Sequence, residues 1–185
     1  MGLMSGKKGI IFGVSNKRGI AYSIAKAVCA EGAELAFTYA GEVMESRVRP
    51  IAEEMDSKII MPCDVTQESE IEAVFNTFKK TYGNLDFIIH AVAFANREDL
   101  MGDFSNISLD GWNLALNVSA YSLIPIAKYS KPLMQNGGSI ITLSYIGSER
   151  SVPNYNIMGV AKAALEASMR YLASELGPHQ IRVNA

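Results

Sequence analysis

The sequence predicts an α/β protein built on a doubly wound parallel sheet with strand order 3-2-1-4-5-6. Short, continuously apolar runs alternate with longer stretches whose apolar residues recur at helical spacing. Because the short runs do not alternate with polar residues, we expect strands buried on both faces, as in parallel sheets. The 185 residues suffice for one domain with a single core, and no repeat or linker divides them.

Four strands and three helices are predicted in the first half of the chain. The strands cover residues 8–14, 34–39, 58–63 and 86–92. The helices between them cover residues 20–31, 42–55 and 67–82. Gly32 follows the first helix as a stop signal, because glycine readily adopts the conformation that ends a helix. Pro50 is expected to interrupt or kink the second helix, since proline has no N–H to donate.

The second half continues the alternation. Residues 109–134 form a long apolar stretch of helical character, which Pro125 and Pro132 should bend or end. A strand, a helix and the start of a sixth strand are then expected over residues 138–144, 154–176 and 181–185. Right-handed βαβ units give the Rossmann arrangement, in which ligands bind at the carboxyl ends of the strands.

Composition and charge exclude several classes of function. The net charge is −2, so the strong positive charge of a nucleic-acid-binding protein is absent. No apolar run reaches the ~18 residues of a membrane span. Residues 1–8 contain no signal sequence, so we expect a cytoplasmic protein without a membrane partner. Cys29 and Cys63 lack metal-ligand spacing, and we expect two free thiols and no metal site.

The loop after the first strand has features of a dinucleotide-phosphate site. Gly13 allows a tight turn, Gly19 lets the backbone approach a diphosphate, and small Ala21 allows close packing of helix and sheet. The following helix N-terminus offers N–H groups and partial positive charge. The spacing differs from the common G-x-G-x-x-G pattern, so a plain strand-to-helix turn is the alternative. Its place after the first strand favours dinucleotide binding.

The ends of the second and third strands face the adenosine half of such a cofactor. No basic residue stands at Ala40 or Gly41, where NADP would need one, and this favours NADH. Glu42 lies close by, although its alternative role is simply to begin a helix. Asp64 would accept a hydrogen bond from the adenine amino group, and the Val65 N–H would contact the ring edge. The alternative is that Asp64 caps the next helix.

The fourth strand ends in the small apolar residues Ala91, Val92 and Ala93. Such a backbone can lie flat against a ribose and a nicotinamide. His90 stands just before them. We interpret it as a core residue rather than a general base, because it lies in an apolar run without an acidic partner. His179 is expected to face solvent.

The most informative pattern lies in residues 144–162. Tyr155 and Lys162 are seven residues apart in the predicted helix, so they share a face with ~10 Å of rise between them. Lys162 would hold the cofactor's ribose hydroxyls and make the tyrosine more acidic, while Tyr155 would point to a substrate carbonyl. Tyr145, at the end of the fifth strand, would face the same cleft. The alternative for each tyrosine alone is a half-buried core residue.

These residues resemble those of the NADH-dependent enoyl-acyl-carrier-protein reductases, a divergent branch of the short-chain dehydrogenase/reductase superfamily. The resemblance covers the whole chain. Its most specific part is Y-x6-K at Tyr155 and Lys162, with Tyr145 ten residues before Tyr155. The ordinary superfamily pattern, Y-x3-K, would need a tyrosine where this chain has Met158.

The resemblance implies the residues of an active site. The NADH site would be lined by Gly13, Gly19, Ile20, Ala40, Asp64, Val65 and Val92, with Lys162 on the nicotinamide ribose. Ala95 would lie beside the acyl substrate, with Tyr145 and Tyr155 as catalytic residues. Family members often have serine at position 19 and a polar residue at position 40, so this chain offers fewer side-chain contacts there.

The resemblance also implies the reaction. NADH would reduce the 2,3 double bond of a trans-2-enoyl thioester on acyl carrier protein, in type II fatty acid biosynthesis, within a homotetramer. Family members continue with a lid and a seventh strand, so the single domain of residues 1–185 would be truncated within or just after its sixth strand. Two alternatives are an ordinary carbonyl reductase, against which Met158 argues, and a dinucleotide-binding homologue without catalysis.

Overall fold

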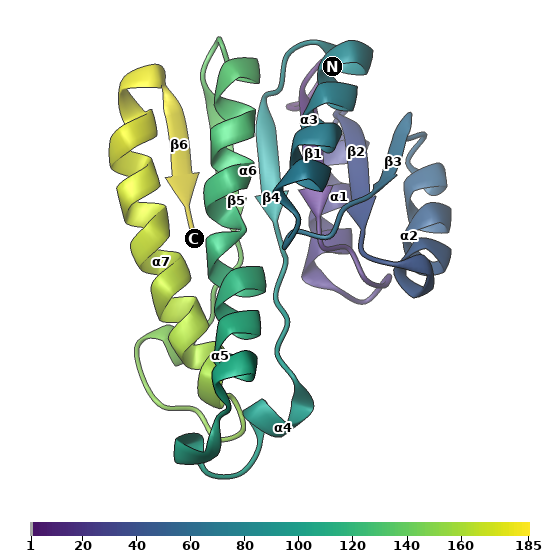
Figure 1. Cartoon of the computed structure of the whole chain (residues 1–185). Coiled ribbons are helices and arrows are strands. Elements are labelled where there is room, and N and C mark those ends of the chain that lie inside the picture. The colour runs from purple at the N-terminus through teal and green to yellow at the C-terminus, as the bar shows by residue number, and fades with distance from the viewer. Residues whose placement is uncertain (1) are drawn as a thin grey trace.

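A six-stranded parallel sheet forms the centre of the computed structural model, which describes residues 2–185 (Figure 1). The strand order is β3-β2-β1-β4-β5-β6, and every neighbouring pair is parallel. The predicted fold class and strand order are confirmed. The order reverses between β1 and β4, and such a switch point is where sheets of this type bind ligands.

The helices and strands follow the predicted alternation, with shorter strands. The strands are β1 (Lys8–Phe12), β2 (Glu34–Tyr39), β3 (Ile59–Pro62), β4 (Phe87–His90), β5 (Gly138–Thr142) and β6 (Ile181–Asn184). The helices are α1 (Ile20–Ala30), α2 (Glu42–Glu54), α3 (Glu68–Tyr82), α4 (Arg97–Leu100), α5 (Leu109–Leu116), α6 (Leu123–Ser130) and α7 (Asn156–Leu176). The short α4 lies in a segment for which the sequence predicts no element.

Successive strand residues face opposite layers of helices. Ile10 and Phe12 of β1 pack in one core cluster with α3, α6 and α7, which lie over one face of the sheet (Figure 1). Ile11, between them, packs on the other face with α1 and α2. Burial on both faces explains why the strands read as continuous apolar runs. The second cluster ends at β4, and Ile141 of β5 is 38% exposed on that face.

The predicted long helix over residues 109–134 is divided just before its first proline. α5 passes into a five-residue π-helical turn, Asn117–Tyr121, before α6 begins. Pro125 lies in the first turn of α6, so the interruption falls in the turn that precedes this proline, as predicted. Pro132 lies in the 3-10 turn that ends the stretch, as predicted. Pro50 does not interrupt α2, which continues through it.

Candidate active site

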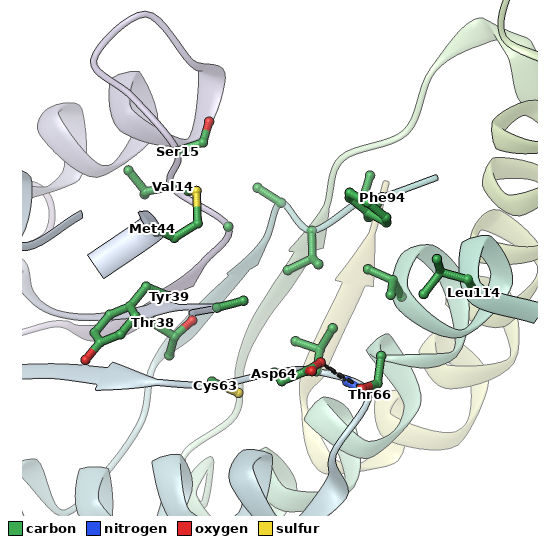
Figure 2. A pocket seen from close by; sticks show the side chains of 17 residues that line it. Val14, Ser15, Thr38, Tyr39, Met44, Cys63, Asp64, Thr66, Phe94 and Leu114 are labelled. Carbon is green, nitrogen blue, oxygen red and sulfur yellow. Dashed lines mark hydrogen bonds between the residues drawn. The ribbon is translucent and has the colours of Figure 1, made fainter. Parts of the chain in front are cut away.

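A cavity of about 560 Å³ opens at the carboxyl ends of β1, β2, β3 and β4 (Figure 2). The predicted cofactor residues that line it are Gly13, Ala40, Asp64, Val65 and Val92. The rest of its wall includes the apolar side chains of Phe94 and of Leu114 from α5 (Figure 2). Its volume lies in the range of small-molecule and cofactor sites. The structure thus gathers residues from four strand ends around one ligand-sized space.

Gly13 and Gly19 serve different purposes in the loop between β1 and α1. Gly13 has a φ of +91°, and a Cβ there would lie 2.3 Å from the Ala91 carbonyl oxygen. It therefore lets the segments after β1 and β4 touch, as well as forming the predicted tight turn. Gly19 has a φ of −80°, and a Cβ there would meet nothing nearer than 3.5 Å. The fold itself does not require glycine at position 19.

Neither Gly19 nor Ile20 lines the cavity, but both mark the start of α1. Gly19 is the N-cap residue, and no side chain within residues 2–185 caps the helix there. The first N–H groups of α1 therefore remain available to an anion. Ile20 is 67% exposed, so its contribution to a cofactor site would come from its backbone.

At the adenosine end, the structure shows how Glu42 and Asp64 stand relative to the helices that follow them. Glu42 is exposed and is the first residue of α2, so it begins a helix. Asp64 does not cap α3, whose N-cap is Gln67. Instead, Asp64 Oδ1 accepts hydrogen bonds from the Thr66 N–H at 2.9 Å and the Thr66 hydroxyl at 2.8 Å (Figure 2). Asp64 Oδ2 accepts none from the described residues, and the side chain is exposed at the cavity.

Tyr145, Tyr155 and Lys162 gather beside the carboxyl end of β5. The two tyrosine rings meet edge-to-face, with centroids 4.8 Å apart. Lys162 is 5% exposed, and its Nζ donates to the Leu143 carbonyl oxygen at 2.6 Å. The Leu143 N–H in turn donates to the His90 carbonyl oxygen at 3.0 Å, which ties this group to the end of β4. The group therefore stands at the same sheet edge as the cavity, although its members do not line it.

Tyr155 and Ala95 occupy the margins of this region. Tyr155 lines a second cavity of about 230 Å³, together with Phe104 and Gly147. Ala95 is half-buried in the extended segment between β4 and α4 and lines neither cavity. The segment from β4 to α5 thus contributes to both cavities, with Phe94 in the first and Phe104 in the second.

The local structure around Tyr155 differs from the prediction of a residue inside the helix. Tyr155 is the N-cap residue of α7. It is flanked by Asn154 and Asn156, whose φ values are +59° and +32°. Asparagine tolerates this region better than most residues, which explains its use on both sides. The Asn156 side-chain amide also donates to the Gly102 carbonyl oxygen at 3.1 Å, so this turn is held to the loop after α4.

The electrostatics of Tyr155 also differ from the prediction. Burial, with a further contribution from Tyr145, raises the pKa of Tyr155 above its usual value. The expectation that Lys162 makes this phenol more acidic is therefore wrong. Burial lowers the pKa of Lys162, and the nearby Glu166 carboxylate opposes that shift. At neutral pH Tyr155 is a protonated hydrogen-bond donor.

His90 is a buried core residue, as predicted. Its Nδ1 lies 2.8 Å from the Thr142 hydroxyl, and its Nε2 lies 2.9 Å from the Ser122 hydroxyl. The Ser122 hydroxyl donates to the Val118 carbonyl oxygen at 2.7 Å, so it must accept from His90 Nε2–H. Nδ1 then accepts from Thr142. Burial and the charge of Lys162 lower the pKa of His90 to about 3, and the imidazole is neutral.

Lowering the pH from 7 to 5 should reduce the free energy of unfolding by about 2 kcal/mol through His90. The unfolded histidine binds a proton near its usual pKa of 6.5, whereas the folded one binds it only near 3. As the pH falls below 6.5, the unfolded state therefore binds a proton that the folded state does not. This binding stabilises the unfolded state, so the free energy of unfolding decreases. Urea unfolding at pH 5, 6 and 7 measures the slope. His90→Gln should reduce the dependence of the unfolding free energy on pH, whereas His179→Gln, at an exposed site, should leave it unchanged. A wild-type free energy of unfolding that does not change between pH 7 and 5 would contradict a buried, neutral His90.

The cysteines contribute no reactive group. Cys63 lines the large cavity, but burial raises its pKa to about 12, so the thiol stays protonated. Cys29 is half-buried, and both cysteines are free thiols, as expected. Within residues 2–185 no group of side chains is arranged to bind a metal ion. In the same range, no helix combines the length and apolarity needed to cross a bilayer.

Ser119 is a contributor to the site that sequence reasoning missed. It lies in the π-helical turn, fully buried. Its hydroxyl accepts from the Phe94 N–H at 3.0 Å and donates to the Phe94 carbonyl oxygen at 3.2 Å. It therefore holds the cavity wall formed after β4. The signal available in the sequence was a serine within an otherwise apolar helical stretch.

Comparison with known proteins agrees with this geometry. Residues 13–185 match the family model described as Enoyl-(Acyl carrier protein) reductase. The chain is 50% identical to the enoyl-[acyl-carrier-protein] reductase [NADH] FabI of Bacillus cereus, with 100% of this chain and 73% of that protein covered. It is 48% identical to the FabI of Rickettsia prowazekii, covering 100% of this chain and 70% of that protein.

Solved structures give the same result. The enoyl-acyl-carrier-protein reductase of Anaplasma phagocytophilum, solved in complex with NAD, matches with a TM-score of 0.95 and 51% identity. That match covers 99% of this chain and 70% of the other. The Bacillus cereus reductase with NADP+ and indole naphthyridinone matches with a TM-score of 0.96 and 50% identity, covering 100% and 73% of the two chains. The chain therefore belongs to the enoyl-acyl-carrier-protein reductase family.

Proposed function

We propose that the protein uses NADH to reduce the 2,3 double bond of trans-2-enoyl thioesters on acyl carrier protein, in type II fatty acid biosynthesis. One observation carries this proposal. The Tyr145–Tyr155 pair and the buried Lys162 stand at the carboxyl end of β5, on the sheet edge where the 560 Å³ cavity opens. Relatives about half identical to this chain bear the name of that activity.

The residues around the cavity suit NADH. The uncapped start of α1 offers N–H groups to a diphosphate, and Asp64 Oδ2 offers an acceptor to the adenine amino group. The backbone at Val92 provides a flat apolar wall. An ammonium group has three N–H donors, and Lys162 uses one on Leu143, so two remain for ribose hydroxyls.

The protein's own groups then act on a bound thioester. When bound, NADH would supply hydride to the β-carbon, and negative charge would develop on the thioester oxygen until a proton reaches the α-carbon. The Tyr155 hydroxyl donates a hydrogen bond to that oxygen, and its raised pKa keeps it protonated for this purpose. Because the charge develops mainly in the transition state, this bond lowers the barrier rather than tightening substrate binding. Lys162 orients the ribose, and Tyr145 packs against the Tyr155 ring.

The decisive experiment incubates the purified protein with NADH and either a trans-2-enoyl thioester or a ketone. We expect loss of NADH absorbance with the enoyl thioester alone. Turnover of the ketone alone would instead indicate an ordinary carbonyl reductase. Met158 argues against that result, since it is buried where the Y-x3-K pattern needs a tyrosine hydroxyl. Binding of NADH with no turnover of either substrate would indicate a homologue without catalysis.

We also infer that residues 1–185 act as one dinucleotide-binding and catalytic domain, within a cytoplasmic homotetramer. Exposed apolar side chains on α5 and α7 support an assembly, notably Leu109, Trp112 and Tyr171. These helices could pack across a two-fold axis. Light scattering during size-exclusion chromatography measures the assembly mass, and a monomer at micromolar concentration would contradict this inference.

A further inference from the structure

Glu166 is a half-buried carboxylate on α7, one helical turn after Lys162. Its carboxylate accepts a hydrogen bond from the Ser144 hydroxyl. Hydrogen bonding from Ser144, with a smaller contribution from Ser148, lowers the pKa of Glu166. Ser144 and Ser148 stand at the two ends of the turn that follows β5, and Tyr145 lies between them. A side chain of α7 therefore holds the start of the turn that carries Tyr145.

The same turn rests directly on α7. A Cβ on Gly147 would lie 2.5 Å from Cδ1 of Tyr155, and a Cβ on Gly159 would lie 2.8 Å from the Gly147 carbonyl oxygen. Two glycines thus remove the side chains that would separate the turn from the helix. In this packing the Tyr145 ring meets the Tyr155 ring at 4.8 Å between centroids. A displacement of the turn would move Tyr145 relative to Tyr155.

Lys162 also contacts this segment: its Nζ donates a hydrogen bond to the carbonyl oxygen of Leu143, the residue just before the turn. Lys162 and Glu166 therefore hold neighbouring parts of one segment from one face of α7. Hydrogen bonds from hydroxyls to a carboxylate are charge-assisted and stronger than neutral ones. Loss of the Glu166 carboxylate would leave the half-buried Ser144 hydroxyl without this partner.

We propose that Glu166 is a positioning residue, which holds the Ser144–Ser148 turn against α7 and so fixes Tyr145 against Tyr155. The inference rests on the proposed reductase function, in which the Tyr155 hydroxyl meets the thioester oxygen. Glu166 acts through the turn and contacts neither substrate nor cofactor in this role. Small errors in the placement of reacting groups are costly to the rate, which is why a residue outside the cavity can affect turnover.

The kinetic test compares Glu166→Ala and Glu166→Gln with Glu175→Ala. Glu175 is a matched control on the same helix, 65% exposed and 3.8 Å from Lys131. Glu166→Ala should lower kcat for the enoyl thioester by about tenfold to a hundredfold, with the KM for NADH within about twofold of wild type. Glu166→Gln, whose amide oxygen still accepts a serine hydroxyl, should recover part of the loss. Wild-type kcat in folded Glu166→Ala would overturn the proposal.

A thermal-unfolding cycle tests the same contacts without any assay of activity. It uses Ser144→Ala, Glu166→Ala and the two combined. If the carboxylate holds Ser144, the double variant should unfold near the midpoint of Glu166→Ala alone. Additive shifts would overturn the proposal, whatever the activity. Should Glu166→Ala fail to fold, Glu166→Leu, whose side chain accepts no hydrogen bond, takes its place in the cycle.

The two tests fail in different ways. A wild-type protein that turns over no enoyl thioester would contradict the proposed function, while the unfolding cycle still decides whether Glu166 holds the turn. A wild-type protein that is active, with additive unfolding shifts and unchanged kcat in Glu166→Ala, would leave the function intact and remove Glu166 from it.

Discussion

Replacing Tyr155 by phenylalanine is expected to lower kcat for a trans-2-enoyl thioester by about 10²-fold, with the KM for NADH nearly unchanged. The substitution removes only the hydroxyl that we propose donates to the thioester oxygen. Tyr155 is half-buried and its ring can remain against Tyr145, so the fold should persist. Burial raises the pKa of Tyr155, and the wild-type rate should therefore not require a phenolate at neutral pH.

Tyr171→Phe is the matched control for this experiment. Tyr171 lies on α7 and is 81% exposed, so its hydroxyl should contribute nothing to turnover. Tyr145→Phe should cost less than Tyr155→Phe, because Tyr145 is proposed to shape the site rather than to donate. Steady-state rates at saturating NADH provide the measurement. If Tyr155→Phe retains more than about a third of the wild-type kcat, another donor stabilises the charged oxygen.

The sheet could be predicted from the sequence because two periodicities alternate without ambiguity along it. Once the strands are recognised as parallel, the handedness of βαβ units leaves few arrangements. The strand ends were less certain. Val14 and Val92 prolong the apolar runs beyond β1 and β4, but they line the cavity rather than pair in the sheet. Apolar character alone does not distinguish these two uses.

The break within residues 109–134 illustrates a different limit. The sequence assigns it to the prolines, which are the local helix breakers. The structure places it just before Pro125 and gives it the form of a π-helical turn, in which Ser119 bonds to Phe94 across 25 residues of chain. The proline predicts that the helix is interrupted, but the bond to a distant partner is not visible in the local sequence.

Some features of the candidate site could likewise be predicted from the sequence, and others could not. Gly13, Asp64 and Val92 could be predicted as neighbours because they follow adjacent strands, and topology alone brings strand ends together. The pKa of Tyr155 could not, because its direction depends on burial, which spacing does not reveal. The hydrogen bond from Ser144 to Glu166 likewise joins residues about twenty positions apart.

Gly13→Ala is expected to lower the free energy of unfolding by about 3 kcal/mol or more. Two costs add. The residue has a φ of +91°, which alanine adopts only with strain, and its Cβ would lie 2.3 Å from the Ala91 carbonyl oxygen. Because the contact is with a backbone carbonyl oxygen just after β4, rotation of a side chain cannot relieve it. The segments after β1 and β4 would have to separate, and NADH binding should weaken as well.

Gly19→Ser is the control for Gly13→Ala, because Gly19 lies in the same loop but has neither a positive φ nor a close backbone neighbour. With a φ of −80° and 3.5 Å of clearance, position 19 accepts a side chain, and serine is a better N-cap than glycine by a few tenths of a kcal/mol. Gly19→Ser should therefore unfold in urea at or slightly above the wild-type midpoint and retain NADH binding. A Gly13→Ala protein as stable as Gly19→Ser would show that the β1–β4 contact does not demand glycine. The requirement at position 13 would then belong to the cofactor and not to the fold.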